Sequence, residues 1–214
     1  MSAAPATTLF VARHGQSEWN HQGRITGQLD IGLSPEGRQQ GEAIARCLAD
    51  EPLDAIVTSA LQRTIATAQP TASAKGLPIA TLAALNEIHL GVLQGRLRDE
   101  RDPEAQALWA AWQADMWGHR VPGGERFDEF AARVEGALAS ILREHRGRRV
   151  LVVGHRATNR VLLGILLGWP RERWPQIRLG NKRFYRIAPG TPAQVTTYWV
   201  GGEKAGASRA GFVM

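Results

Sequence analysis

Two histidines and two arginines stand just behind short apolar runs that have the composition of buried strands. They follow three such runs: Arg13 and His14 after residues 8–12, Arg63 after residues 54–59, and His155 after residues 150–153. Ligands of α/β domains bind beyond the carboxyl ends of the strands, so we expect these four side chains to converge. Guanidinium groups pair with oxyanions, and a neutral imidazole is a nucleophile. The pattern therefore favours a pocket for a tetrahedral oxyanion such as phosphate.

The order of the predicted elements indicates the fold class. Strands are expected over residues 8–12, 54–59, 78–82, 150–153, 184–187 and 195–200, and helices over residues 35–50, 60–74, 103–116, 127–145 and 157–167. The first helix has the clearest start, because Ser34 can cap it and Pro35 suits its first position. Strands that alternate with helices predict an α/β domain, a three-layer sandwich with a mostly parallel central sheet flanked by helices. We expect residues 1–214 to form a single domain.

The composition is that of an ordinary globular protein, with 43% hydrophobic and 21% charged residues. The 26 basic and 20 acidic side chains give a net charge of +6, which favours anionic ligands. The basic cluster at residues 146–149 lacks interleaved aromatic residues, so we expect a solvated turn and no nucleic-acid partner. No apolar run is long enough for a membrane span, and the first residues lack the features of a signal peptide. A single cysteine, Cys47, fits a cytoplasmic location.

Six ordered sequence blocks carry a family resemblance. They are Leu9–Asn20, Gly27–Ser34, Ser59–Ala68, Leu85–Gly95, Val121–Glu125 and Val152–His155. In this order they resemble the histidine phosphatase superfamily, which includes the cofactor-dependent phosphoglycerate mutases. The resemblance extends over residues 8–168, and six blocks in order are far more specific than the triplet Arg-His-Gly alone. It implies a phosphoglycerate mutase-like fold.

The resemblance also implies roles for individual residues. His14 is then the nucleophile that becomes phosphohistidine, and Glu87 is the proton donor to the leaving alcohol. The phosphate-binding residues are Arg13, Arg63 and His155, with Asn20 and Ser17 nearby. Neither a metal nor a cofactor is implied.

Two of these assignments leave alternatives open. Ser17 and Asn20 could organise the loop after His14 instead of contacting the phosphate. Glu18 or Glu125 could replace Glu87 as the acid.

The chemistry of these residue types agrees with the roles. Cations around His14 disfavour its protonated form, so the nucleophile stays neutral, and the same cations stabilise the phosphoryl group during transfer. An alkoxide is a poor leaving group. Glu87 must therefore hold a proton near neutral pH, through desolvation or through a phosphate beside it. Once ionised, the same carboxylate can accept a proton from the water that releases the phosphate.

The residues that recognise the alcohol are less clearly marked. Arg156 stands where many relatives have glycine, so it could bind a second acidic group of the substrate or turn away and pair with an acid such as Glu125. Residues 96–120 form an insertion that would roof the pocket. One of its tryptophans, Trp109, Trp112 or Trp117, could contact the leaving group, with Trp112 as the leading candidate, although tryptophans at this spacing also suit helix packing. We expect residues 201–214 to form a flexible tail or to fold over the site.

The leading hypothesis is a metal-independent phosphatase that hydrolyses a small phosphorylated metabolite through phosphohistidine. The first alternative is a cofactor-dependent phosphoglycerate mutase. The short insertion, and a tail whose only basic residues are Lys204 and Arg209, favour the phosphatase. The second alternative is a non-catalytic sensor of a phosphorylated ligand. The expected partner is a small-molecule phosphomonoester, and an exposed sheet edge could also pair across a homodimer.

Overall fold

Strand β1 (Thr8–Arg13) lies in the middle of the sheet, and its side chains alternate between two apolar cores. Leu9 and Val11 belong to one core, and Phe10 and Ala12 belong to the other. Successive side chains of a strand point to opposite faces, so a run that is apolar throughout requires cover on both sides. Both faces of the sheet must therefore be covered by other elements, such as helices, at this strand.

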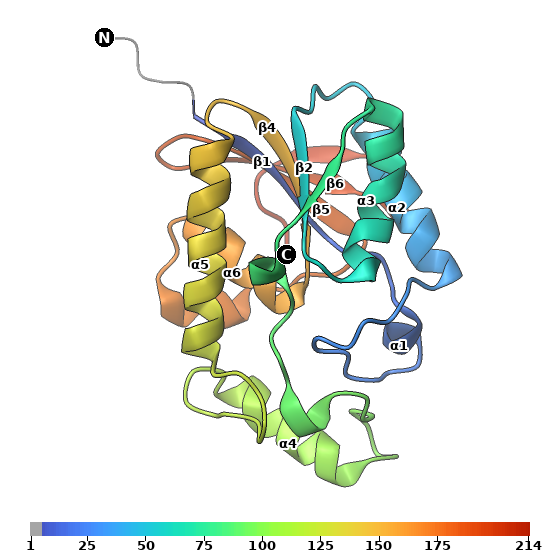
Figure 1. Cartoon of the computed structure of the whole chain (residues 1–214), viewed down its shortest axis with the longest axis vertical. Helices are drawn as coiled ribbons and strands as arrows, with labels where there is room; N and C mark the ends of the chain where they lie inside the picture. Colours follow the sequence, from blue (N-terminus) through green and yellow to red (C-terminus); the bar gives the residue numbers. More distant parts are fainter. Residues whose placement is uncertain (1–5) are drawn as a thin grey trace.

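The computed structural model describes residues 6–214, in which seven strands form one sheet (Figure 1). The other strands are β2 (Ala55–Thr58), β3 (Ile79–Thr81), β4 (Arg149–Gly154), β5 (Arg183–Ala188), β6 (Gln194–Trp199) and β7 (Ser208–Ala210). Their order across the sheet is β3-β2-β4-β1-β5-β6-β7. The first four are parallel to one another, and β5, β6 and β7 extend the sheet by antiparallel pairing.

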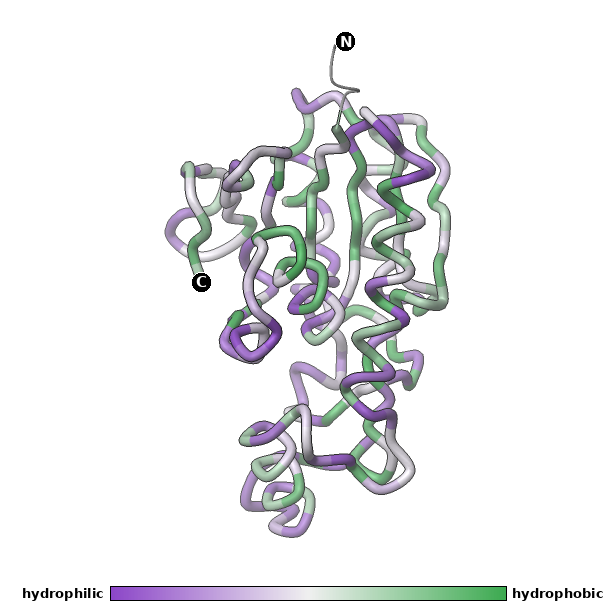
Figure 2. The backbone as a smooth tube through the Cα atoms, turned by 90° about the vertical axis from the view of Figure 1, so that its left-hand side faces the viewer, coloured by the Kyte–Doolittle hydropathy of each residue, from purple (hydrophilic) through white to green (hydrophobic). Residues whose placement is uncertain are grey.

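Helices cover both faces of the sheet. Helices α5 (Phe127–Glu144) and α6 (Arg156–Leu166) pack on one face, and α2 (Pro35–Cys47) and α3 (Gln62–Lys75) pack on the other (Figure 1). The apolar residues gather along the central strands, whereas the helices alternate between apolar and polar positions (Figure 2). The three-layer α/β sandwich expected from the sequence is confirmed.

The remaining helical elements are short or lie at the edge of the fold. They are α1 (Glu18–His21), α4 (Pro103–Ala114) and three 3₁₀ segments, η1 (Ala83–Leu85), η2 (Gly91–Leu93) and η3 (Arg171–Gln176). The cap expected at Ser34 is confirmed, because its hydroxyl accepts a hydrogen bond from the amide of Gly37 at 3.1 Å. Helix α4 lies apart from the sheet, beyond the carboxyl ends of the parallel strands (Figure 1).

The end of the chain differs from the flexible tail expected from its sequence. Strand β7 pairs with β6, and the hydroxyl of Tyr185 donates to the carbonyl of Val213 at 2.9 Å. The ring of Phe212 packs against those of Tyr185 and Trp169 at centroid distances of 4.8 and 5.8 Å. These contacts with distant residues order a segment whose own sequence has no strand periodicity. Among residues 6–214, no helix is both long enough and apolar enough to cross a bilayer.

Candidate active site at the carboxyl ends of β1 and β4

The register of two neighbouring parallel strands brings His14 and His155 together. Arg13 at the end of β1 pairs with Gly154 at the end of β4, and the amide of His14 donates to the carbonyl of Gly154 at 2.9 Å. The residue that follows each of these strands is a histidine. Their ring centroids lie 5.1 Å apart with an interplanar angle of 59°. The convergence expected from the sequence is thus a direct result of strand register.

The ring of His14 is held in one tautomer. Its Nδ1 lies 2.6 Å from the carbonyl oxygen of Gly15. Because a carbonyl oxygen only accepts, the proton of the neutral ring belongs on Nδ1, which leaves the lone pair on Nε2. Burial, followed by the charges of Arg63 and Arg13, holds the pKa of His14 well below its usual value. The ring is therefore neutral at neutral pH and has the form that a nucleophile needs.

The loop that follows His14 fits tightly against the start of α2. A Cβ added to Gly15 would collide with the carbonyl of Gly37, and a Cβ added to Gly37 would collide with the carbonyl of Gln16. The amide of Gly15 also donates to the hydroxyl of Thr67 at 2.9 Å. Only glycines allow the two backbones to approach so closely, and this contact fixes the position of the carbonyl that orients His14.

Ser17 and Asn20 have different positions in this loop. Ser17 caps α1, since its hydroxyl accepts from the amide of Asn20 at 3.1 Å while the side chain of Asn20 accepts from the amide of Ser17 at 3.3 Å. Ser17 is fully buried and is not part of the cleft lining, whereas Asn20 lines the cleft. Of the two roles considered for Ser17, its hydrogen bonds with Asn20 fit the organisation of the loop.

The ring of His155 is held by Ser59, which follows strand β2. The Nε2 atom of His155 lies 2.8 Å from the hydroxyl oxygen of Ser59, and that hydroxyl also lies 2.8 Å from the hydroxyl of Thr64. The other ring nitrogen, Nδ1, is buried and has no hydrogen-bond partner among residues 6–214. Burial, with further contributions from Arg63 and His14, holds the pKa of His155 well below its usual value. Ser59 therefore fixes one nitrogen and leaves the other for a ligand.

Two buried arginines flank the histidines. Arg63 in the first turn of α3 is 1% exposed and donates to the carbonyls of Leu29 and Gly27 at 2.8 and 2.7 Å. Arg13 donates to the carbonyl of Leu179 at 3.2 Å. Burial lowers the pKa of each arginine to about 10, so both remain charged at neutral pH. The Nε atoms of both are buried without a partner in the described part of the chain, so each arginine retains donors for an oxyanion.

Glu87 lies at the start of α6, next to the second histidine. Its carboxylate accepts from the amide of Ala157 at 3.2 and 3.1 Å and from the amide of Thr158 at 3.3 Å. These donors belong to the first turn of the helix, where a carboxylate is stabilised by otherwise unpaired amides. Glu87 also lines the cleft that contains His14. It is therefore positioned to exchange a proton with a group bound there.

The backbone that carries Glu87 is held by Arg133 of α5. Arg133 donates to the carbonyls of Ala84, Asn86 and Glu87 at 2.9, 2.9 and 3.1 Å. It also pairs with Glu125 at 2.6 Å. Glu125 is thus part of the support for this loop. Neither Glu125 nor Glu18, the two alternatives considered for the acid, is among the residues that line the cleft.

Most of the residues expected at the site lie in this cleft, which has a volume of about 70 Å³. The cleft is lined by Arg13, His14, Asn20, Arg63, Glu87 and Arg156, and His155 lies behind it against the ring of His14. Trp109, one of the tryptophans considered for contact with the leaving group, also lines the cleft. Further lining residues that the sequence analysis missed are Arg24, Thr26 and Arg98. They belong to loops, where no motif marks them. Their only sequence signal is closeness to the blocks that contain Asn20 and Glu87.

Trp112 is not the tryptophan that faces the cleft. It is 3% exposed and belongs to the core, whereas Trp109, less than one helical turn earlier on α4, lines the cleft. The two rings pack together with centroids 5.2 Å apart. The spacing of the tryptophans correctly indicated a shared side of the helix, but it does not distinguish the edge that packs inward from the edge that faces a ligand.

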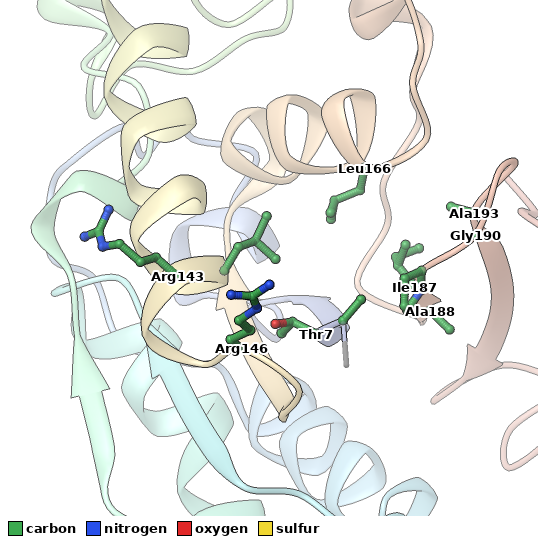
Figure 3. Close-up of a pocket in the computed structure, with 11 residues that line it drawn as sticks. Thr7, Arg143, Arg146, Leu166, Ile187, Ala188, Gly190 and Ala193 are labelled. Atoms are coloured by element: carbon green, nitrogen blue, oxygen red, sulfur yellow. The ribbon is translucent and has the colours of Figure 1, made fainter. Parts of the chain in front are cut away.

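A larger cavity of about 620 Å³ lies at the opposite end of the sheet (Figure 3). It is formed near Thr7 before β1, Leu166 at the end of α6 and Ile187 in β5. Its described lining includes Arg143 and Arg146 but neither a histidine nor a carboxylate. The smaller cleft is therefore the one with groups for chemistry. Nowhere in residues 6–214 do three or more His, Cys, Asp or Glu side chains form a group that could hold a metal ion.

Comparison with known proteins identifies the family. Residues 9–200 match the family described as the histidine phosphatase superfamily (branch 1). The chain belongs to this superfamily. Among its curated relatives is the probable phosphoglycerate mutase GpmB of Serratia proteamaculans, 32% identical over 193 residues that cover 90% of this chain and 89% of the relative. The protein of the same name from Photorhabdus laumondii is 36% identical over 179 residues, covering 84% and 83% of the two chains.

Solved structures with the same fold include phosphatases. A mycobacterial glucosyl-3-phosphoglycerate phosphatase, solved with VO3, has a TM-score of 0.77 and 31% identity, with 87% of this chain and 91% of the other covered. A putative alpha-ribazole-5'-P phosphatase from Escherichia coli has a TM-score of 0.80 and 26% identity, with coverage of 94% and 99%. The family resemblance carried by the six sequence blocks is confirmed, and so is the phosphoglycerate mutase-like fold.

Proposed function

We propose that this member of the histidine phosphatase superfamily hydrolyses a small phosphomonoester through a phosphohistidine on His14. The observation that carries the proposal is the fixed tautomer of His14. Its Nδ1 is committed to the carbonyl of Gly15, so the lone pair of Nε2 is available in a cleft that also contains Arg13 and Arg63. A neutral nucleophile among fixed cations is what transfer of a negatively charged phosphoryl group requires.

In the first step, Nε2 of His14 attacks phosphorus and the bond from phosphorus to the alcohol oxygen breaks. Arg13, Arg63 and Nδ1–H of His155 donate to the phosphoryl oxygens as their charge is redistributed. The leaving oxygen takes a proton from Glu87.

In the second step, water attacks the phosphohistidine. Glu87, now a carboxylate, accepts a proton from the water, the bond from phosphorus to Nε2 breaks, and inorganic phosphate leaves. The imidazole returns to its neutral form. No step requires a metal ion, so we expect activity to persist in the presence of a chelator.

Two observations favour hydrolysis over mutase transfer. A mutase must keep water away from its phosphohistidine, yet none of residues 201–214 lines the cleft, because this segment pairs with β6 at the edge of the sheet. The solved structures described above include phosphatases, although the curated relatives carry the name of probable mutases. The single free cysteine, Cys47, is consistent with a cytoplasmic enzyme.

The test is release of inorganic phosphate from a panel of phosphomonoesters by the wild type and by His14→Ala. We expect release by the wild type and its loss in the variant, with no interconversion of 2- and 3-phosphoglycerate when 2,3-bisphosphoglycerate is supplied. Interconversion without phosphate release would instead identify a mutase. Binding of a phosphorylated ligand without turnover of any panel member would identify the non-catalytic sensor.

A further inference from the structure

Arg160 is a buried charged residue to which the proposed reaction assigns no role. It lies on α6, five residues after His155, and is 4% exposed. Burial, followed by the charge of Arg156, lowers the pKa of Arg160 to about 10, so its guanidinium group stays charged at neutral pH. Among residues 6–214 it forms no ion pair with a carboxylate. A buried charge without a counter-ion costs free energy, so the hydrogen bonds of this group are its main compensation.

The hydrogen bonds of Arg160 lead to two other segments of the chain. Its Nε donates to the backbone carbonyl of Ile177 at 2.9 Å, and its Nη1 lies 3.5 Å from Sδ of Met116. A thioether sulfur is a weak acceptor, so the bond to Ile177 is the stronger of the two. Ile177 begins the segment of residues 177–182 between η3 and β5, which we call the connecting loop. Arg160 therefore joins α6 to the connecting loop.

The connecting loop also holds the side chain of Arg13. The carbonyl of Leu179, two residues after Ile177, accepts a hydrogen bond from Nη1 of Arg13 at 3.2 Å. Residues 178–181 make no backbone–backbone hydrogen bond with any residue between 6 and 214. The carbonyls of Ile177 and Leu179 are therefore held by the side chains of two arginines, one from α6 and one from the end of β1.

The residue before Arg160 supports the backbone of Arg13. Nδ2 of Asn159 donates to the carbonyl of Ala12 at 2.9 Å, and this carbonyl belongs to the peptide bond that leads into Arg13. Asn159 is buried. Two consecutive residues of α6 thus contact the supports of Arg13: Asn159 binds the backbone next to it, and Arg160 binds the loop that receives its side chain.

We propose that Arg160 is a positioning residue that fixes the guanidinium group of Arg13 through the connecting loop. Without the bond from Arg160 to Ile177, the loop loses one of the two contacts that hold its carbonyls, and Arg13 loses a fixed anchor at Leu179. This inference rests on the part of the proposed function in which Arg13 binds the phosphoryl oxygens. A small displacement of such a donor weakens binding and transfer, because its hydrogen bonds to the oxyanion depend on geometry.

The test is a double-mutant cycle between Arg160 and Arg13, with orthovanadate as the probe. Vanadate is a tetrahedral oxyanion like phosphate, and its dissociation constant can be measured without turnover. We expect Arg160→Met to raise this constant by about 10- to 100-fold when Arg13 is present. In the Arg13→Gln background the same substitution should raise it by less than about threefold, because the group that Arg160 positions is already absent.

The cycle separates positioning from the charge of Arg160. Loss of a positive charge near the cleft weakens the binding of an anion whether or not Arg13 is present. Equal factors in the two backgrounds would therefore show that Arg160 acts through its charge or through general stability, and would refute the proposal. The NMR signal of the buried Nε–H of Arg13 should also shift in Arg160→Met. An unchanged signal would refute the proposal as well.

Two further variants complete the design. Arg160→Lys keeps the charge but cannot donate to Ile177 and Met116 together, so we expect a rise of about three- to tenfold in the dissociation constant, again only when Arg13 is present. This variant keeps the cycle measurable if Arg160→Met does not fold. Arg173→Met is the matched control at an exposed arginine of η3, stacked on Trp169, and should leave vanadate binding unchanged. Thermal unfolding of each variant shows whether it is folded at the temperature of the measurement.

The outcomes distinguish this inference from the proposed function. If phosphomonoesters are hydrolysed but the two substitutions act additively on vanadate binding, the positioning role is refuted and the phosphatase proposal stands. If vanadate binds with the non-additive pattern but no phosphomonoester is hydrolysed, the phosphatase proposal fails and the positioning role is supported. If the wild type does not bind vanadate, Arg13 has no oxyanion to bind and the positioning role is refuted.

Discussion

The carboxylate of Glu87 accepts a hydrogen bond from the backbone amide of Ala157, with Oε2 3.1 Å from the nitrogen. This contact joins two segments that are 70 residues apart in the sequence. Ala157 is separated from His155 by one residue, so the candidate acid and the second histidine are held on the same short piece of backbone. A group bound by His155 is therefore presented to Glu87 without a separate positioning step.

Replacement of Glu87 by glutamine tests its role as the acid. The amide oxygen of glutamine can still accept from Ala157, so the fold should be retained, but the proton for the leaving alcohol is lost. We expect kcat for alkyl phosphates to fall by about 10²- to 10⁴-fold and kcat for nitrophenyl phosphate, which has a good leaving group, to fall much less. Glu18→Gln is the matched control. Equal losses on both kinds of substrate would show that Glu87 is not the acid.

Ser59 is expected to act by positioning His155. In Ser59→Ala the Nε2 atom of His155 loses its partner, and its tautomer is no longer selected. We expect kcat/KM to fall by about 10- to 100-fold and the ¹⁵N chemical shifts of the His155 ring to change. Thr64→Ser, which keeps the neighbouring hydroxyl, should change neither quantity. Unaltered ring shifts in Ser59→Ala would refute the positioning role.

Arg133 should stabilise the loop that carries Glu87. A lysine at this position lacks the planar guanidinium group, so it cannot donate hydrogen bonds to the three carbonyls and to Glu125 at the same time. We expect Arg133→Lys to lower the free energy of unfolding by about 1–3 kcal/mol and to lower kcat/KM as Glu87 is displaced. Arg143→Lys, on the exposed side of the same helix, is the control. A variant as stable and as active as the wild type would contradict the assignment.

The two buried histidines predict a pH dependence of stability. The pKa of each is lowered in the folded state, so the folded protein keeps both rings neutral while the unfolded chain binds protons below about pH 6.5. The contribution of the two histidines to the free energy of unfolding is therefore fully present above about pH 6.5 and is lost as the pH falls below it. Each histidine should reduce the free energy of unfolding by about 1.4 kcal/mol per pH unit below 6.5.

The measurement is denaturant unfolding of the wild type and of the double variant His14→Gln, His155→Gln between pH 5 and 7.5, a range that brackets the unfolded histidine pKa of about 6.5. The free energy of unfolding should fall less steeply with decreasing pH in the double variant than in the wild type, because glutamine does not titrate. Parallel pH profiles for the two proteins would mean that the rings are not held neutral.

The site residues that directly follow an apolar strand could be predicted from the sequence. His14 and His155 follow apolar strands directly, and parallel register then brings them together, so local sequence was sufficient. Trp109 and Trp112 show the limit of this reasoning. Both occupy the apolar side of α4, and only the packing of that helix against the core determines which ring meets the cleft.

Other features depend on contacts between distant residues and were therefore missed. Arg98 carries no motif, and its place in the cleft follows from the path of the loop after η2. Strand β7 has no alternation of its own and is ordered by β6 and by the packing of Phe212. Ser59 was expected at the end of a strand, and its contact with His155 appears only once β2 and β4 lie side by side.

The central claim is that Nε2 of His14 takes up the phosphoryl group. The most direct measurement is a rapid acid-free quench of the enzyme with a phosphate-labelled substrate, followed by mass spectrometry of its peptides. We predict an acid-labile phosphoryl group on the peptide that contains His14, formed before phosphate is released and absent from His14→Ala. A label on any other residue, or phosphate release at the wild-type rate by His14→Ala, would contradict the account.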